Sequence, residues 1–121
     1  MFEPINPEAL GAPRGYSHGM LAPAGGRLLF VAGQTALGED GRIVDGGFVA
    51  QFERALERVV AVVQAAGGTA ANIGRMTIYV TSRADYLANL KPLGEAYRRV
   101  MGRHYPAMAL VEVAALVDEG A

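Results

Sequence analysis

Chemistry-bearing side chains cluster in one short segment near the N-terminus. The segment Arg14-Gly15-Tyr16-Ser17-His18-Gly19 brings together a guanidinium, a phenol, a hydroxyl and an imidazole. These groups can hold an anion and exchange protons with a bound molecule. The same composition also fits a solvated loop that enters a strand, because loops are polar in any case. Both interpretations stay open from the sequence alone.

A second candidate is Glu112, a carboxylate inside the apolar run Leu110–Val113. Side chains alternate between the two faces of a strand, so Glu112 can simply point to solvent. A carboxylate in such a run is otherwise paired with a partner in a cleft. The sequence does not decide between these two placements.

Other catalytic constellations are missing from the sequence. The chain has no cysteine, and neither His18 nor His104 has a second histidine at helical ligand spacing, so no metal site is expected. Neither a G-x-x-x-x-G-K-[ST] motif nor a strand-anchored G-x-G-x-x-G motif is present. Ser17 and Ser82 are the only serines, and neither sits in a nucleophile elbow, which excludes a standard hydrolytic triad.

Length and charge set further bounds. The 121 residues suffice for a single domain spanning residues 1–121. The balance of 11 basic against 12 acidic residues argues against nucleic acid as a partner. The chain contains no apolar stretch long enough for a membrane span and no secretory signal, so we expect a cytoplasmic protein. At 51% hydrophobic residues the chain is apolar for its size, which favours a ligand cleft or a second subunit that covers the excess.

The first half of the chain predicts a hairpin and a long helix. Residues 1–13 contain three prolines and read as an irregular arm. Residues 19–22 and 28–32 are apolar runs around a Pro-Ala-Gly-Gly turn, which predicts a β-hairpin. Residues 48–66 have helical periodicity, with an apolar stripe formed by Phe48, Phe52, Leu56, Val59, Val60 and Val63. We expect Asp45 to help cap this helix or to favour its dipole, and Gly67-Gly68 to end it.

The second half predicts two more strands and a helix. Residues 76–81 are rich in β-branched and aromatic side chains, which favours a strand. Residues 86–103 are helical in pattern, with the main helix beginning near Lys91 and Pro92 in its first turn. The run 108–117 is the last predicted strand. This order predicts an α+β fold in which both helices cover one face of a single sheet and leave an apolar face for another subunit.

Taken together, these segments resemble the Rid family, also called the YjgF or L-PSP family, of reactive-intermediate deaminases. The resemblance covers nearly the whole chain in order. The matching segments are Gly15-Tyr16, Leu29-Phe30-Val31-Ala32-Gly33-Gln34, Ala65-Ala66-Gly67-Gly68, Tyr79-Val80-Thr81, Glu95-Ala96-Tyr97 and Tyr105-Pro106-Ala107-Met108-Ala109-Leu110-Val111-Glu112-Val113.

The resemblance implies a chorismate-mutase-like fold assembled as a homotrimer, with small-molecule sites in clefts between subunits. Well-known family members hydrolyse imines and enamines to ketoacids and ammonia without any cofactor. The family holds the substrate carboxylate with the arginine of a Pro-Ala-Arg segment. No catalytic residue of this chain is assigned from the resemblance.

This sequence departs from the family at the cleft. Met108 stands where the family has its carboxylate-binding arginine, and methionine carries no charge and no hydrogen-bond donor. Leu110 and Ala32 likewise replace a frequent cysteine and a small polar residue. Lys91 or Arg14 can supply the charge from elsewhere, or both can be solvated. The predicted ligand-binding residues are Tyr16, Ala32, Gly33, Gln34, Lys91, Met108 and Leu110.

A second departure is the end of the chain. Family members usually continue into a further strand ending in Glu-Ile-Glu, whereas this sequence stops at Asp118-Glu119-Gly120-Ala121. We therefore expect either a shortened chain or a member that lacks the strand. Two functions are predicted: an imine or enamine deaminase with a rearranged carboxylate anchor, or a binder of small, partly apolar metabolites. The endoribonuclease activity in older family names finds little support in the net charge of -1.

Overall fold

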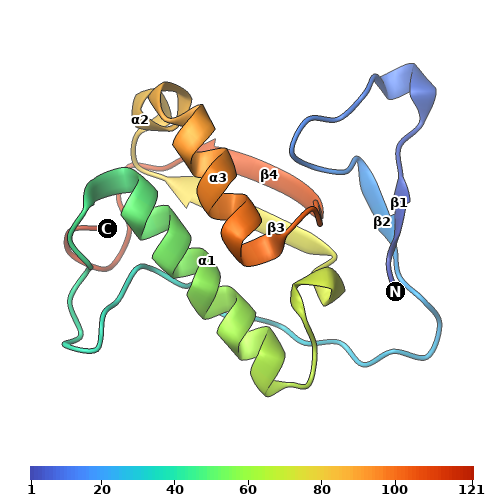
Figure 1. Cartoon of the computed structure of the whole chain (residues 1–121), viewed down its shortest axis with the longest axis horizontal. Coiled ribbons are helices and arrows are strands. Elements are labelled where there is room, and N and C mark those ends of the chain that lie inside the picture. The colour runs from blue at the N-terminus through green and yellow to red at the C-terminus, as the bar shows by residue number, and fades with distance from the viewer.

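Helices lie on one side of the molecule and short strands on the other in the computed structural model, which describes residues 1–121 (Figure 1). The strands and α-helices are β1 (Glu3–Ile5), β2 (Gly19–Leu21), α1 (Gly47–Ala65), β3 (Arg75–Val80), α2 (Arg83–Ala88), α3 (Leu90–Met101) and β4 (Ala107–Glu112). Two 3-10 turns, η1 (Glu8–Leu10) and η2 (Ala70–Asn72), complete them. The α+β class predicted from the sequence is confirmed.

Helix α1 follows the predicted stripe and stops at the predicted glycines. Leu56, Val60 and Val63 are its buried residues. Gly67 has a φ of 90°, a conformation that favours glycine, and its N–H donates to the Gln64 carbonyl. Of the two roles predicted for Asp45, capping is wrong, whereas a favourable interaction with the helix dipole stays a prediction. The N-cap residue is Gly46, and because a capping bond comes from the N-cap side chain, Asp45 lies one position too early.

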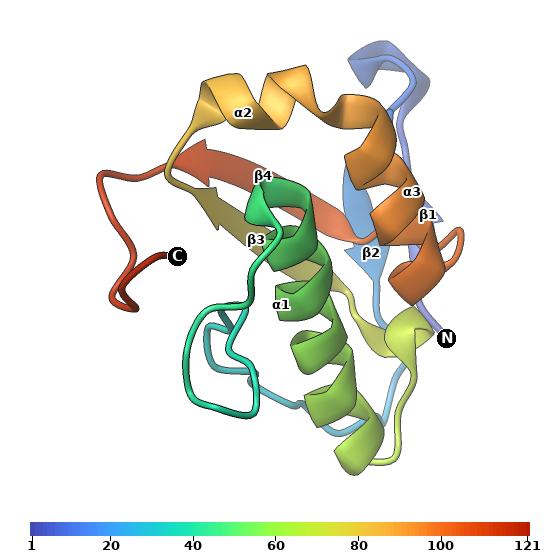
Figure 2. The same ribbon diagram turned by 60° about the vertical axis from the view of Figure 1, so that its left-hand side comes forward.

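Strands β3 and β4 run parallel and form the central pair, with Met76 opposite Met108 and Ile78 opposite Leu110. Burial alternates along β3, so one face of the strand is covered and the other is exposed. Figure 2 shows α1 and α3 crossing the same side of this pair. The predicted arrangement of two helices over one face therefore holds for β3 and β4.

The core lies between these helices and the covered face. Six buried residues form one cluster: Leu56, Val60, Val63, Ile73, Tyr97 and Met101. Met76 and Met108 are partly buried and pack against this cluster from the strands. The apolar stripes of α1 and α3 are thus removed from water together with the inner face of β3 and β4.

The helical pattern of residues 86–103 divides into two helices. Asn89 ends α2 and precedes α3, which starts at Leu90 and keeps Pro92 in its first turn, as predicted. The Ser82 side chain accepts a hydrogen bond from the Asp85 N–H at 3.0 Å and caps α2. The short α2 connects the end of β3 to α3.

The predicted hairpin between residues 19–22 and 28–32 is wrong. Strand β2 pairs instead with β1, antiparallel, so the N-terminal residues are not an irregular arm. The His18 N–H also donates to the Asn6 side chain at 2.8 Å, which fixes this pairing. The composition of residues 19–22 and 28–32 is typical of strands, but composition does not say which segment pairs with β2.

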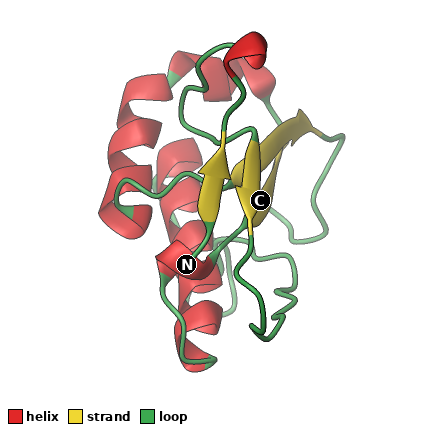
Figure 3. Ribbon diagram, turned by 90° about the vertical axis from the view of Figure 1, so that its right-hand side faces the viewer, coloured by secondary structure: helices red, strands yellow, loops and turns green.

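The strands form two separate pairs rather than one sheet, β1 with β2 and β3 with β4 (Figure 3). A single bridge between Ser17 and Ala107 links them. The predicted last strand is also too long, because β4 ends at Glu112 and not at Val117. The chain then turns back, where Asp118 accepts a hydrogen bond from the Thr35 hydroxyl and Gly120 accepts one from Gln51.

Glu112 is paired at the end of β4. Its carboxylate accepts the backbone N–H of Arg83 at 2.7 Å, at the first residue of α2. A carboxylate at a helix N-terminus satisfies a free donor and opposes the helix dipole. Of the two placements open from the sequence, the structure shows pairing, but with a helix end and not in a cleft.

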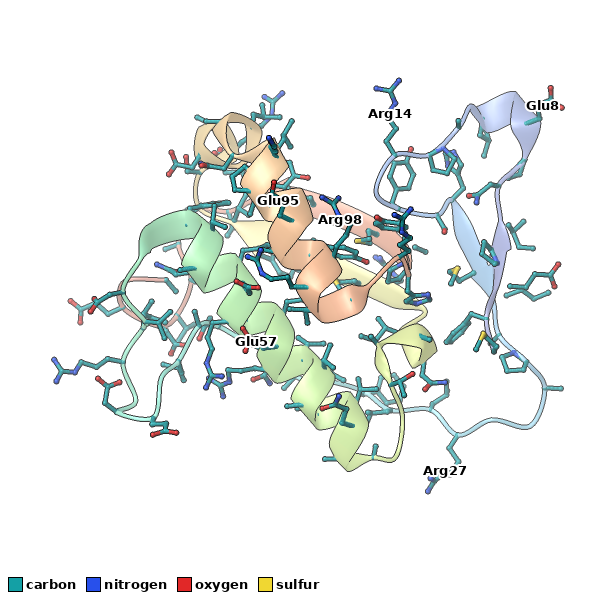
Figure 4. The ribbon with its side chains drawn as sticks, viewed as in Figure 1. Glu8, Arg14, Arg27, Glu57, Glu95 and Arg98 are labelled. Atoms are coloured by element: carbon teal, nitrogen blue, oxygen red, sulfur yellow. The ribbon has the colours of Figure 1, made fainter.

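We predict that Glu112→Ala lowers the free energy of unfolding by about 1 kcal/mol, because the Arg83 N–H loses its acceptor. Urea unfolding measures this change. Glu57→Ala is the matched control, since Glu57 is an exposed carboxylate on α1 with its side chain directed away from the strands (Figure 4). Equal effects of the two substitutions would show that the bond to α2 contributes nothing.

None of the helices has the length and apolar character that crossing a membrane requires. The cytoplasmic location stays a prediction from the sequence.

Candidate functional site

A cleft of about 510 Å³ lies between α3, the covered face of β3 and β4, and the loop that holds Tyr16. Helix α3 contributes one continuous face to it, formed by Leu90, Leu93, Gly94, Tyr97 and Arg98. Helical geometry places residues three and four apart on the same side, which explains why these five line up. The cleft is therefore bounded by a rigid helix on one side.

The floor of the cleft comes from the strands. Ile78 of β3 and Met108 and Leu110 of β4 line it together. Met108 and Leu110 are two positions apart on one strand and so project to the same face. Two of the three residues predicted to depart from the family pattern, Met108 and Leu110, therefore lie in one cleft, where they offer only apolar contact.

The rim comes from the loop that the sequence marked as a candidate. Arg14, Gly15 and Tyr16 line the cleft, and the Tyr16 ring meets the His18 ring edge-on at 5.3 Å. The buried Ser17 hydroxyl donates to the Tyr105 carbonyl at 2.6 Å, and the Ser17 N–H donates to the Pro106 carbonyl at 3.0 Å. These bonds attach the loop to the start of β4, so it is not merely a solvated connection.

An aromatic wall closes the inner end. The Tyr97 and Tyr105 rings are stacked, with centroids 5.3 Å apart and an interplanar angle of 6°. The Tyr97 hydroxyl donates to the His104 carbonyl at 2.5 Å, and burial raises the pKa of this phenol well above its usual value. The His104 Nε2 lies 2.7 Å from the Ile73 carbonyl and so carries the proton. Both groups are committed to backbone acceptors.

We predict that Tyr97→Phe lowers the free energy of unfolding by about 1 kcal/mol at neutral pH, because the His104 carbonyl loses its donor. The phenol pKa is higher in the folded than in the unfolded state. Its contribution is therefore complete below about pH 10 and is lost as the pH rises above that value. Denaturant unfolding across alkaline pH should show a shallower decline for the variant than for the native protein.

Tyr79→Phe is the control for this prediction, because the Tyr79 hydroxyl makes no hydrogen bond within the chain and phenylalanine keeps the apolar ring on the uncovered strand face. Its neutral and alkaline stability should match that of the native protein. A decline with pH that is the same in all three proteins would contradict the role of the Tyr97 phenol.

The remaining predicted site residues lie outside this cleft. Ala32, Gly33 and Gln34 belong to the irregular segment after β2, where the Gln34 side chain donates to the Ala32 carbonyl at 3.2 Å. Lys91 is exposed in the first turn of α3 and is not among the cleft residues. The single chain therefore brings together Tyr16, Met108 and Leu110 but not the other four.

Arg98 is the main cleft residue that sequence reasoning missed. It follows Tyr97 directly, and a polar residue beside an apolar stripe reads as solvent-facing. The available signal was its spacing from Leu90 and Gly94, which puts it on the same helical face. The lining residues include phenols, guanidiniums and apolar groups, with no carboxylate and no imidazole.

A second hollow of about 400 Å³ lies on the outer side of α1 and α3. It holds a bidentate ion pair in which Arg99 donates to Glu53 at 2.7 and 3.0 Å. This hydrogen bonding lowers the pKa of the Glu53 carboxyl. The pair joins the two helices across the surface, so this hollow has a structural explanation. No group of three or more metal-ligating side chains lies close enough together to hold a metal ion.

Comparison with known proteins places this fold and cleft in a family. The sequence profile described as Endoribonuclease L-PSP matches residues 6–121. The 2-iminobutanoate/2-iminopropanoate deaminase of Capra hircus is 30% identical over 117 residues, covering 94% of this chain and 77% of that protein.

Solved structures agree with the sequence comparison. The Rid-family protein YyfB from Yersinia pestis matches with a TM-score of 0.83 and 30% identity over 98% of this chain and 90% of that one. Escherichia coli TdcF with bound serine matches with a TM-score of 0.63 and 30% identity over 88% of this chain and 81% of that one. The profile matches nearly the whole chain, and a Rid protein has the same fold. The chain therefore belongs to the Rid family, whose profile is described as Endoribonuclease L-PSP.

Proposed function

We propose that the protein hydrolyses small 2-imino acids, and the enamines in equilibrium with them, to 2-oxo acids and ammonia. The observation that carries the proposal is the cleft, where an apolar floor is rimmed by Tyr16 and two guanidiniums and holds no acidic group. Such a cleft suits a short anion with an apolar tail. A relative that is 30% identical is named a 2-iminobutanoate/2-iminopropanoate deaminase.

The reaction needs water and proton transfers but no strong base. Water adds to the carbon of the protonated imine, and a proton moves from the added water to nitrogen. The C–N bond then breaks as the remaining hydroxyl gives up its proton, which leaves the carbonyl, and the released ammonia takes up that proton as ammonium. Four tyrosines line the cleft: Tyr16, Tyr86, Tyr97 and Tyr105. The Tyr97 hydroxyl is bonded to the His104 carbonyl, whereas the Tyr16 phenol makes no hydrogen bond and lies on the loop at the rim. A phenol both donates and accepts a hydrogen bond, so we assign the proton relay to Tyr16.

A pyridoxal-phosphate dehydratase that releases 2-aminoacrylate or 2-iminobutanoate supplies the substrate for a test. We expect the purified protein to accelerate the appearance of the 2-oxo acid over spontaneous hydrolysis. Tyr16→Phe should slow the catalysed rate by about 100-fold, the lower end for loss of a proton-transfer group, whereas the exposed Tyr79→Phe should not. A native rate equal to the spontaneous rate would refute the proposed activity.

We also propose a homotrimer. The uncovered strand face presents Tyr79 and Val111, which are 56% and 42% exposed. Phe30, in the segment after β2, is 89% exposed. Large apolar side chains of this kind are what a subunit interface covers. Light scattering on the purified protein should give three times the chain mass. Tyr79→Lys should shift that mass towards the monomer, and a native monomer at all accessible concentrations would contradict the proposal.

A second candidate function is the binding of small, partly apolar metabolites without turnover. The apolar side chains of Ile78, Met108 and Leu110 across the whole floor favour it. Thermal-shift measurements separate the two candidates. Stabilisation by neutral apolar ligands but not by 2-oxobutanoate would support binding alone, and the reverse would support the deaminase.

A further inference from the structure

Arg98 is an arginine without a partner of its own. The next residue, Arg99, is engaged with Glu53, whereas Arg98 takes part in none of the ion pairs or side-chain hydrogen bonds of the chain. Glu95, one turn earlier on α3, is not paired with it either. Figure 4 shows Arg98 on the side of α3 that faces the loop carrying Arg14. Arg98 is exposed at the edge of the cleft, so no protein acceptor competes with water or a ligand for its five N–H donors.

Gly94 explains how this guanidinium is held at the cleft. Glycine inside a helix destabilises it relative to alanine, so a glycine there calls for a local reason. A Cβ built on Gly94 would lie 3.3 Å from the Nη1 atom of Arg98, closer than ordinary van der Waals contact. The missing side chain leaves room for the guanidinium to lie against the helix, beside the other residues that line the cleft.

The charges and surfaces around Arg98 select the class of ligand. Arg14 and Arg98 are the ionised side chains of the cleft, and no carboxylate lines it. Met108 and Leu110 lie at the floor and offer only apolar contact. A flat carboxylate matches the fork of a guanidinium, and a short hydrocarbon tail matches the floor. Arg14 extends outward from its loop in Figure 4, whereas Arg98 is fixed on a helix.

We propose that Arg98 is the carboxylate-binding residue of this cleft and takes the role that Met108 cannot fill. The ligand class is a short monocarboxylate with an apolar tail. This inference rests on the proposed function for the identity of the carboxylate as that of a 2-imino acid. It places the anchor on α3, whereas the position occupied by Met108 lies on β4.

Binding of stable analogues tests this assignment directly. We would titrate the native protein and its variants with 2-oxobutanoate and with its neutral amide, and measure the affinities by calorimetry. Arg98→Met should weaken binding of the acid about tenfold, because one charge-assisted hydrogen-bonding group is lost, and should leave binding of the amide unchanged. Arg27→Met is the matched control, since Arg27 is an exposed arginine in the loop after β2 and should bind both as the native protein does.

Gly94→Ala gives a second, independent variant. The added methyl group moves the Arg98 guanidinium by a few tenths of an ångström while alanine favours the helix. Acid binding should therefore fall, by less than in Arg98→Met, without a lower melting temperature. Equal acid binding by the native protein and Arg98→Met would overturn the inference. So would an equal loss for acid and amide, or no binding of the acid by the native protein.

The outcomes also separate this inference from the proposed function. If Arg98→Met binds 2-oxobutanoate more weakly but the native protein does not accelerate imine hydrolysis, the deaminase proposal fails and the role of Arg98 in binding the carboxylate is supported. If the native protein hydrolyses imines and Arg98→Met retains the full kcat/KM, the proposed role of Arg98 is refuted and the deaminase proposal is supported.

Discussion

Met108→Arg is expected to raise imine hydrolysis and 2-oxobutanoate binding by about 10- to 100-fold. The substitution adds a second guanidinium to the cleft, and its long stem lets it reach from the floor to the carboxylate that Arg98 binds. Met108 is only partly buried against the core, so an arginine stem can replace its contacts while the guanidinium reaches the cleft. Steady-state kinetics and calorimetry measure the two gains separately.

The same substitution also tests where the anchor lies. In the double variant Met108→Arg with Arg98→Met, the new arginine should restore the acid binding that the loss of Arg98 removes. Met108→Leu is the control, because leucine keeps the apolar volume and should restore nothing. If Met108→Arg neither raises the native activity nor rescues Arg98→Met, the carboxylate does not bind in this cleft within reach of both positions.

Leu93→Ala is expected to lower the free energy of unfolding by about 3 kcal/mol, the largest stability effect predicted for this chain. Leu93 is 4% exposed on α3 and also lines the cleft, so truncation leaves a cavity between the helix and the strands. Chemical denaturation measures the loss. Activity at temperatures where the variant stays folded should also fall, because α3 positions Arg98.

Leu90→Ala is the matched control for this helix. Leu90 lies on the same face one turn earlier but is 52% exposed, so its truncation should cost less than 1 kcal/mol. Similar losses for the two leucines would mean that α3 is not held by burial at Leu93, and the rigid wall of the cleft would lose its basis.

Periodicity predicted the elements that bury a regular face. The apolar stripe of residues 48–66 predicted α1, and the strand-like run 76–81 predicted β3. Both patterns are visible in the sequence because each element buries one apolar face. The pairing of β2 could not be predicted in the same way. Its partner β1 has three residues including Pro4, which composition does not mark as a strand, whereas the more strand-like residues 28–32 lie unpaired.

The cleft was predictable in part for a similar reason. Strand alternation puts Met108 and Leu110 on one face, and Tyr16 belongs to the polar segment that precedes β2. Arg98 could not be predicted from an apolar pattern. Its place at the cleft depends on the room that Gly94 leaves beside it, which only the structure shows. Ala32, Gly33 and Gln34 were predicted from the family resemblance, in which sites lie between subunits. The single chain therefore does not test the placement of these three residues in a site between subunits.

The most direct test of the account is a crystal structure with 2-oxobutanoate bound at a concentration that saturates binding in solution. The account predicts that the carboxylate lies within hydrogen-bond distance of the Arg98 guanidinium, with the ethyl group over Met108 and Leu110. A carboxylate bound to Lys91 or to Arg14 alone, or an acid bound outside this cleft, would contradict it.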